Sequence, residues 1–333
     1  MDVSYMIGWI RVFLLVVCLF IAARSDYSIL KVRDQHWINW LFPSSILLLI
    51  ELAILRTHAT NLYMIAALIA LASVSFTKPP SILRAAKWKL PDFTLFLIYI
   101  IGLVGLFGGA LQNADTNFVN LILGDESSET TLWWSMLGAF ITILVFLSAW
   151  RYGIIQGGAD AKALIIITIF APSWQFLPDP ITSSEESLFL LPPSIVIFLW
   201  ASIVFIFAPP ILLFQNAING NIEHWTDLKM AWHSTRKPIS EIPTSAVDGK
   251  QVWILTEVAN REDDQIRIVN RMLPRKNSLS QETILEKLSQ LEEIGMEKVW
   301  IATKHPFVAY LFLAIFPLLL FGDPIGLIAD RFD

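Results

Sequence analysis

Long, nearly uninterrupted runs of apolar residues dominate the hydrophobic and polar pattern of this 333-residue chain. An α-helix needs about 20 such residues to cross the hydrocarbon layer of a membrane, or somewhat fewer with anchored ends. The runs that approach this length are residues 6–23, 37–55, 62–76, 92–111, 132–150, 161–177, 188–214 and 306–321. The pattern therefore predicts a polytopic α-helical membrane protein with about eight transmembrane helices.

One stretch, residues 218–304, departs from this pattern because charged residues recur every few positions and no run could span a bilayer. Within it, residues 252–258, 265–272 and 299–303 have the composition of β-strands. Residues 280–294 carry an apolar stripe at helical spacing, and Gly295 is placed to end that helix. We expect a transmembrane core at 1–217, an α+β domain at 218–304, and a final helix with a short tail at 305–333.

The distribution of positive charge between the loops predicts the orientation of the chain. One alternate set of loops holds nine lysines and arginines, whereas the opposite set and the tail hold two. Cytoplasmic loops carry the excess of positive charge in membrane proteins. We therefore expect a multi-pass protein of the cell membrane with a cytoplasmic α+β domain and with both termini outside.

Composition agrees with a membrane protein and narrows the possible partners. Apolar residues make up 55% of the chain, charged residues make up 16%, and the mean hydropathy is +0.59. This apolar composition makes membrane lipid the expected surroundings. The net charge of −5 provides no positive field that would attract nucleic acid, so nucleic acid is not an expected partner. A single cysteine, Cys18, rules out a four-cysteine zinc site, and His224 and His233 lack a supporting acidic pattern. We expect no metal and no cofactor.

Two aspartates are the strongest candidates for chemistry. Asp26 lies just past the first predicted helix, and Asp160 begins the sixth within Gly157-Gly158-Ala159-Asp160. Four predicted helices separate them, so the chain returns to the cytoplasmic side and the two carboxyl groups can meet. Carboxylates that lie close together share a proton, so that one can activate water while the other protonates a peptide carbonyl. This pairing is what an aspartic protease needs.

Neighbouring residues extend this candidate site and leave alternatives open. Gly157 and Gly158 permit a tight turn and the close approach of an extended substrate. Lys162 either extends to the membrane interface, sets topology, or favours ionisation of the aspartates. Asp34 competes with Asp26 for the catalytic role, and it could also contact a basic substrate. In the simplest alternative Asp160 only caps its helix and Asp26 is one more loop charge.

Taken together, the two aspartate segments resemble the archaeal prepilin peptidases, including the preflagellin peptidases, which are membrane aspartic proteases with a Gly-x-hydrophobic-Asp signature. The matching positions are Gly157, Gly158, Ala159, Asp160 and Lys162 in the second segment, and Asp26, Val32 and Asp34 in the first. The chain departs from the family in two respects. Arg33 stands where relatives often have proline, and four predicted helices rather than two separate the aspartates.

The resemblance implies that Asp26 and Asp160 are catalytic. It also implies that the substrates are type IV prepilin-like or preflagellin precursors, which lose a short basic leader at the cytoplasmic face of the membrane. One alternative is an intramembrane protease like signal peptide peptidase or presenilin, but Asp26-Tyr27 reverses that group's Tyr-Asp pair and no Pro-Ala-Leu motif is present. Another alternative is a transporter or membrane scaffold, in which the two aspartates would couple ions or set topology.

Two further charged residues lie within predicted spans. Arg11 lies about one turn from the outer end of the first, where we expect its long side chain to extend to the membrane surface. Glu51 lies near the outer end of the second, and we expect it to do the same or to pair with a polar neighbour.

Overall fold

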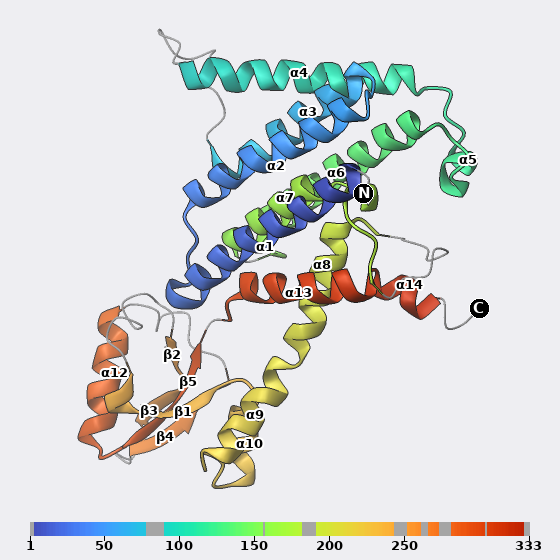
Figure 1. Ribbon diagram of the computed structural model, residues 1–333. Coiled ribbons are helices and arrows are strands. Elements are labelled where there is room, and N and C mark those ends of the chain that lie inside the picture. The colour runs from blue at the N-terminus through green and yellow to red at the C-terminus, as the bar shows by residue number, and fades with distance from the viewer. Residues whose placement is uncertain are drawn as a thin grey trace. The chain divides into compact units, whose positions relative to one another are not determined.

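The computed structural model of this protein describes residues 3–77, 90–155, 157–181, 191–242, 252–260, 266–272, 281–303 and 305–329. The chain divides into two compact units (Figure 1). The helical unit consists of Met1–Asp26, Lys31–Ser202 and Phe307–Asp333, and the α+β unit consists of Tyr27–Leu30 and Ile203–Pro306.

The α-helices of the helical unit account for most of its described residues. They are α1 (Val3–Ile29), α2 (Asp34–Ile54), α3 (Ala59–Phe76), α4 (Leu90–Gln112), α5 (Phe118–Leu123), α6 (Ser128–Arg151), α7 (Gly158–Phe170), α8 (Pro193–Ile206), α13 (Phe307–Phe321) and α14 (Pro324–Ala329). Helix α8 continues into the α+β unit at Ile203.

Six helical segments in the described part of the chain are long and apolar enough to cross a membrane. They are α1, α2, α3, α4, α6 and the segment Pro193–Ile218, which joins α8 to α9 (Ala208–Ile218). The predicted helical membrane protein is confirmed to this extent. The other two predicted spans are also helical but shorter, because α7 has 13 residues and α13 has 15.

Helix α7 lies in the core of the helical unit. Its side chains from Ala163 to Phe170 are all fully buried, and it contacts α2, α3, α6 and α13. The run is rich in isoleucine on every side of the helix, and a helix that is apolar all round is one that packs inside. The beginning of α7, which carries Gly158 and Asp160, is therefore fixed by a rigid element.

Helix α1 presents one continuous buried face to this core. Buried residues recur every three or four positions along it, including Arg11, Leu15, Cys18, Ala22 and Asp26. This spacing places them on one side of an α-helix. Asp26 is thus directed inward by the same helical periodicity that buries the leucines before it.

The α+β unit contains two small antiparallel sheets. Its elements after α9 are α10 (Leu228–Ala231), β1 (Thr235–Pro238), β2 (Val252–Ile254), β3 (Thr256–Asn260), β4 (Ile266–Asn270), α12 (Gln281–Glu293) and β5 (Lys298–Thr303). One sheet has the order β1-β5-β2, and β3 pairs with β4. Helix α9, which the sequence places before the predicted domain boundary at residue 218, contacts α10 and β1 within this unit.

The predicted strand at residues 252–258 is two strands, and Leu255 separates them. Its N–H group donates to the carbonyl oxygen of Trp300 in β5, whereas its own carbonyl accepts from the N–H group of Arg271 after β4, each at 2.8 Å. The chain therefore passes from one sheet to the other at this residue. The predicted strands at 265–272 and 299–303 correspond to β4 and β5, while β1 was not predicted.

The two faces of the three-stranded sheet pack against different elements. Val299 and Ile301 of β5 join Val252, Ile254, Leu288 and Leu291 in one buried cluster, in which the last two residues come from α12. Trp300, which points to the other face, packs with Met230, Ala231 and Leu255. Gly295 has a φ of 82°, so it ends the helical segment in the left-handed conformation, as predicted.

Candidate active site

Asp26 and Asp160 lie close to each other within the helical unit. Helix α1 continues to Ile29, so the expectation that Asp26 follows the helix is wrong, and Asp26 belongs to its last turns. Asp160 lies in the first turn of α7, ahead of its apolar run and outside the six candidate spans. Burial, together with the nearby negative charge of Asp26, raises the pKa of the Asp160 carboxyl group to about 7.

The Asp26 side chain is held by a third element, which the sequence did not indicate. Asp26 is buried, and its Oδ2 accepts a hydrogen bond of 3.2 Å from the backbone N–H group of Val308. Val308 belongs to the first turn of α13, where N–H groups have no acceptor inside their own helix. The positive end of the α13 dipole also favours a carboxylate at this place. The start of α13 is therefore part of the candidate active site.

Gly157 is required by space rather than by backbone conformation. Its φ of −89° and ψ of 118° are open to any residue, so the expected role in a tight turn is wrong for this position. A Cβ atom added at Gly157 would collide with the carboxylate of Asp160. At Gly158 the same atom would lie 3.2 Å from the ring of Trp150, which is a tight contact. The structure thus explains the spacing between Gly157 and Asp160: the carboxyl group occupies the space that a side chain would fill.

Ala159 and Lys162 connect this segment to the surrounding helices. Ala159 is partly buried and packs against the hydrophobic core of the helical unit. The Lys162 Nζ atom lies 2.5 Å from Oδ1 of Asp34 and 5.5 Å from the centre of the Trp150 ring. Asp34 is the first residue of α2, so this ion pair joins the starts of α2 and α7.

The ion pair separates the roles of the two competing aspartates. Lys162 pairs with Asp34, whereas the carboxyl group whose charge acts on Asp160 is that of Asp26. Asp34 is also the more exposed of the two, with a side-chain exposure of 57%. The geometry therefore favours Asp26 as the partner of Asp160, and it places Asp34 at the edge of the site.

Arg11 and Glu51 form a second buried polar cluster. The expectation that Arg11 extends to the membrane surface is wrong, because its side chain is fully buried, donates to Glu51 and also donates to the carbonyl oxygen of Phe170 at 2.7 Å. The guanidinium group lies 5.2 Å from the centre of the Phe176 ring. Of the two expectations for Glu51, pairing with a polar neighbour is therefore the one observed, and that neighbour is Arg11. Asp160 lies in the first turn of α7, and Phe170 is its last residue. The cluster of Arg11 and Glu51 therefore holds the end of α7 that is farther from Asp160.

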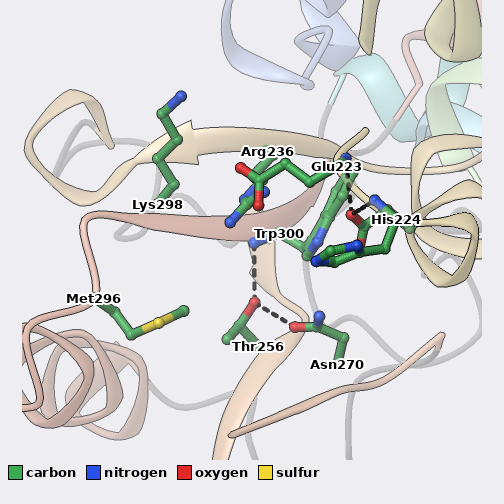
Figure 2. Close-up of a pocket in the computed structure, with 9 residues that line it drawn as sticks. Glu223, His224, Arg236, Thr256, Asn270, Met296, Lys298 and Trp300 are labelled. Carbon is green, nitrogen blue, oxygen red and sulfur yellow. Dashed lines mark hydrogen bonds and ion pairs between the residues drawn. The ribbon is translucent and has the colours of Figure 1, made fainter. Parts of the chain in front are cut away.

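A small polar pocket of about 120 Å³ lies in the α+β unit, apart from these aspartates (Figure 2). Arg236 and Glu223 line it and form an ion pair of 2.9 Å. The hydroxyl group of Thr256 accepts from the backbone N–H of Trp300 and bonds to Asn270, each at 2.9 Å. These polar groups satisfy one another, so the pocket has the character of a structural network rather than of a reactive site.

Metal chemistry has no evident site among the described residues, where no group of three or more histidines, cysteines and carboxylates could hold an ion. Comparison with models of protein families finds no match, and comparison with curated proteins finds none either.

Proposed function

We propose that this protein is a membrane-embedded aspartic endopeptidase of the prepilin and preflagellin peptidase type, with Asp26 and Asp160 as its catalytic residues. One observation carries the proposal. Asp26 and Asp160 are 134 positions apart in sequence, yet α1 and α7 bring them near enough that the charge of Asp26 adds to the effect of burial, and the two together raise the pKa of Asp160 to about 7. Such a pair can hold one shared proton near neutral pH.

The proposed reaction needs one ionised and one protonated carboxyl group. Asp26, which accepts the Val308 N–H, is suited to be the ionised group that removes a proton from water. The water oxygen then attacks the peptide carbonyl carbon while Asp160 donates its proton to the carbonyl oxygen. When the tetrahedral intermediate collapses, the C–N bond breaks and the leaving amine takes up the proton from Asp26. One hydroxyl group of the intermediate returns its proton to Asp160 as the carbonyl re-forms, which restores the starting state of the pair.

The proposed substrate is a prepilin-like or preflagellin precursor, cut at the cytoplasmic face to remove its short basic leader. In this arrangement the eight predicted spans lie in the membrane, and Asp160 lies at the cytoplasmic edge, just before the span at residues 161–177. Both termini are external and the α+β domain is cytoplasmic. Asp34 is suited to hold a basic leader by charge attraction, but it pairs with Lys162 in the free protein. A leader would therefore compete with Lys162 for this carboxylate.

The test is cleavage of candidate precursors by membranes that contain the protein, with the new N-terminus mapped by mass spectrometry. We expect Asp26→Asn and Asp160→Asn each to abolish cleavage, because either change removes one carboxyl group of the proton-sharing pair. Asp34→Asn is the comparison at a neighbouring aspartate: it should weaken the binding of a basic leader but still cleave, because both carboxyl groups of the catalytic pair remain. Normal processing by a well-folded Asp26→Asn or Asp160→Asn variant would refute the assignment. Activity lost only in Asp34→Asn would move the first catalytic position to Asp34.

A further inference from the structure

The α+β unit carries an exposed apolar face on α9. Large apolar side chains at spacings of four, three and four lie exposed on one side of this segment, namely Phe207, Ile211, Phe214 and Ile218. We call these four residues the α9 stripe. The opposite side is fixed in the unit by buried Asn216, whose amide donates to the carbonyl oxygens of Ala231 at 3.0 Å and Ser234 at 2.8 Å. The helix is thus held by one face and leaves an apolar face outside.

A second group of exposed residues follows the stripe in the turn that leads into α10. Trp225 is 89% exposed. The turn that carries it is held by the Asp227 carboxylate, which accepts hydrogen bonds from the backbone N–H groups of Glu223 at 3.1 Å and His224 at 3.0 Å. Lys229 and Trp232, four and seven positions after Trp225, are also exposed. These three exposed residues lie along one short helical segment, in which a 3₁₀ turn at Trp225–Asp227 leads directly into α10.

The length of the preceding helix points to the partner of this surface. Helix α8 has 14 residues and rises about 21 Å, whereas the hydrocarbon layer is about 30 Å thick. Helix α8 alone does not qualify as a membrane span, whereas the combined segment Pro193–Ile218 does. The segment that meets the length of a membrane span therefore includes the α9 stripe. Tryptophan and lysine are the residues that favour the boundary between acyl chains and headgroups.

We propose that the α9 stripe, together with Trp225, Lys229 and Trp232, is an interfacial membrane contact of the α+β unit. The partner is the lipid surface itself: the phenylalanine and isoleucine side chains enter the outer acyl region, and the indole and ammonium groups lie among the headgroups. The membrane contact thus extends past the predicted span end at residue 214 and into the predicted cytoplasmic domain.

The test is the collision of spin labels with lipid-soluble oxygen and with a water-soluble nickel chelate, using the full chain in lipid vesicles. Cys18→Ser removes the single native cysteine, and labels are then introduced singly by Ile211→Cys, Ile218→Cys or Trp225→Cys. Glu292→Cys, on the exposed side of α12, is the matched control in water. All four positions are exposed or lie at a helix surface, where substitution is well tolerated.

We expect the ratio of oxygen to nickel collision rates to be at least five-fold higher at residues 218 and 225 than at residue 292, and highest at residue 211. A ratio at 218 and 225 equal to that at 292 would show that the surface lies in water and would overturn the proposal. Low collision rates with both reagents would show that a protein covers it, which would overturn the proposal equally. The experiment is independent of precursor cleavage, so its outcome does not depend on the proposed function.

Discussion

The carboxylate of Asp26 accepts a hydrogen bond from the backbone N–H group of Val308, with 3.2 Å between Oδ2 and N, across 282 positions of sequence. The bond joins the last turns of α1 to the first turn of α13, where the helix has no internal acceptor for this N–H group. Asp26 therefore has a structural role that can be separated from its proposed catalytic role. The choice of replacement decides which of the two roles is removed.

We expect Asp26→Ala to be less stable than Asp26→Asn by about 1–3 kcal/mol, because alanine leaves a buried N–H group without an acceptor whereas asparagine keeps an oxygen. Thermal unfolding of both variants in the same detergent measures the difference. The control is the pair Asp34→Ala and Asp34→Asn, at an exposed position where the carboxylate pairs with the side chain of Lys162. Equal melting temperatures for the two Asp26 variants would contradict a structural role for the bond to Val308.

The two neighbouring glycines provide a sharper test of the site. Alanine at residue 157 places its Cβ atom against the Asp160 carboxylate, so the carboxyl group must move. A displacement of about 1 Å can reduce an enzymatic rate by about 100-fold, and we expect a loss of this order in precursor cleavage for Gly157→Ala. Gly158→Ala should lose much less activity, because the Trp150 ring can shift by a few tenths of an ångström.

Cleavage rate and melting temperature should be measured together for both glycine variants. Neither glycine has a positive φ, so alanine introduces no backbone strain, and at Gly158, inside α7, it gains up to about 1 kcal/mol of helix propensity. A loss of activity in Gly157→Ala without a loss of thermal stability is the expected signature. If Gly158→Ala were the more damaging of the two, the proposed position of the Asp160 carboxyl group would be wrong.

The buried pair of Arg11 and Glu51 should behave as a unit. Removing one partner leaves a buried charge without compensation, so Arg11→Met or Glu51→Leu alone should destabilise the protein by about 3–5 kcal/mol. The double variant replaces both charges with apolar side chains and should unfold close to the wild type. Unfolding of the two single variants and the double variant in a detergent titration gives the coupling free energy. A double variant as unstable as the sum of the single variants would show that the two residues act independently.

The sequence predicted those features of the fold that depend on composition and local periodicity. Long apolar runs identified the membrane helices, and β-branched and aromatic residues identified β4 and β5. Strand β1 escaped prediction because its sequence, Thr-Arg-Lys-Pro, has no apolar alternation, and it is a strand through its pairing with β5. The proximity of Asp26 and Asp160 could be predicted because an even number of helices returns the chain to one side.

The side-chain partners of the polar residues could not be predicted, since each is set by packing between distant elements. Nothing near Arg11 in the sequence indicates Glu51 or Phe170, and nothing near Asp26 indicates Val308. One signal was nevertheless present. Arg11 and Asp26 fall on the same helical face as Leu15 and Ala22, and this shared face would have indicated that Arg11 points inward rather than toward lipid headgroups.

The pKa of Asp160 leads to a prediction about pH and stability. Because burial and, secondly, the charge of Asp26 raise this pKa to about 7, the folded protein keeps the Asp160 proton up to that pH, whereas an unfolded chain releases it near pH 4. Between these values the folded state binds more protons than the unfolded state, so the free energy of unfolding decreases as pH rises. Above about pH 7 both states are ionised and this contribution becomes constant. The Asp160→Asn variant has no carboxyl group at this position, so it lacks this contribution to the pH dependence of stability.

The melting temperatures of the wild type and Asp160→Asn should therefore be compared in detergent from pH 4 to pH 8.5. We expect the wild type to lose stability relative to Asp160→Asn between about pH 4 and pH 7 and the difference to level off above pH 7. In the proposed protease, cleavage by the wild type should fall over the upper part of the same range, because the shared proton is lost. Groups remote from the pair titrate equally in both proteins and cancel in the comparison. A difference in melting temperature that stays constant from pH 4 to pH 8.5 would show that Asp160 titrates normally and that the two carboxyl groups do not share a proton.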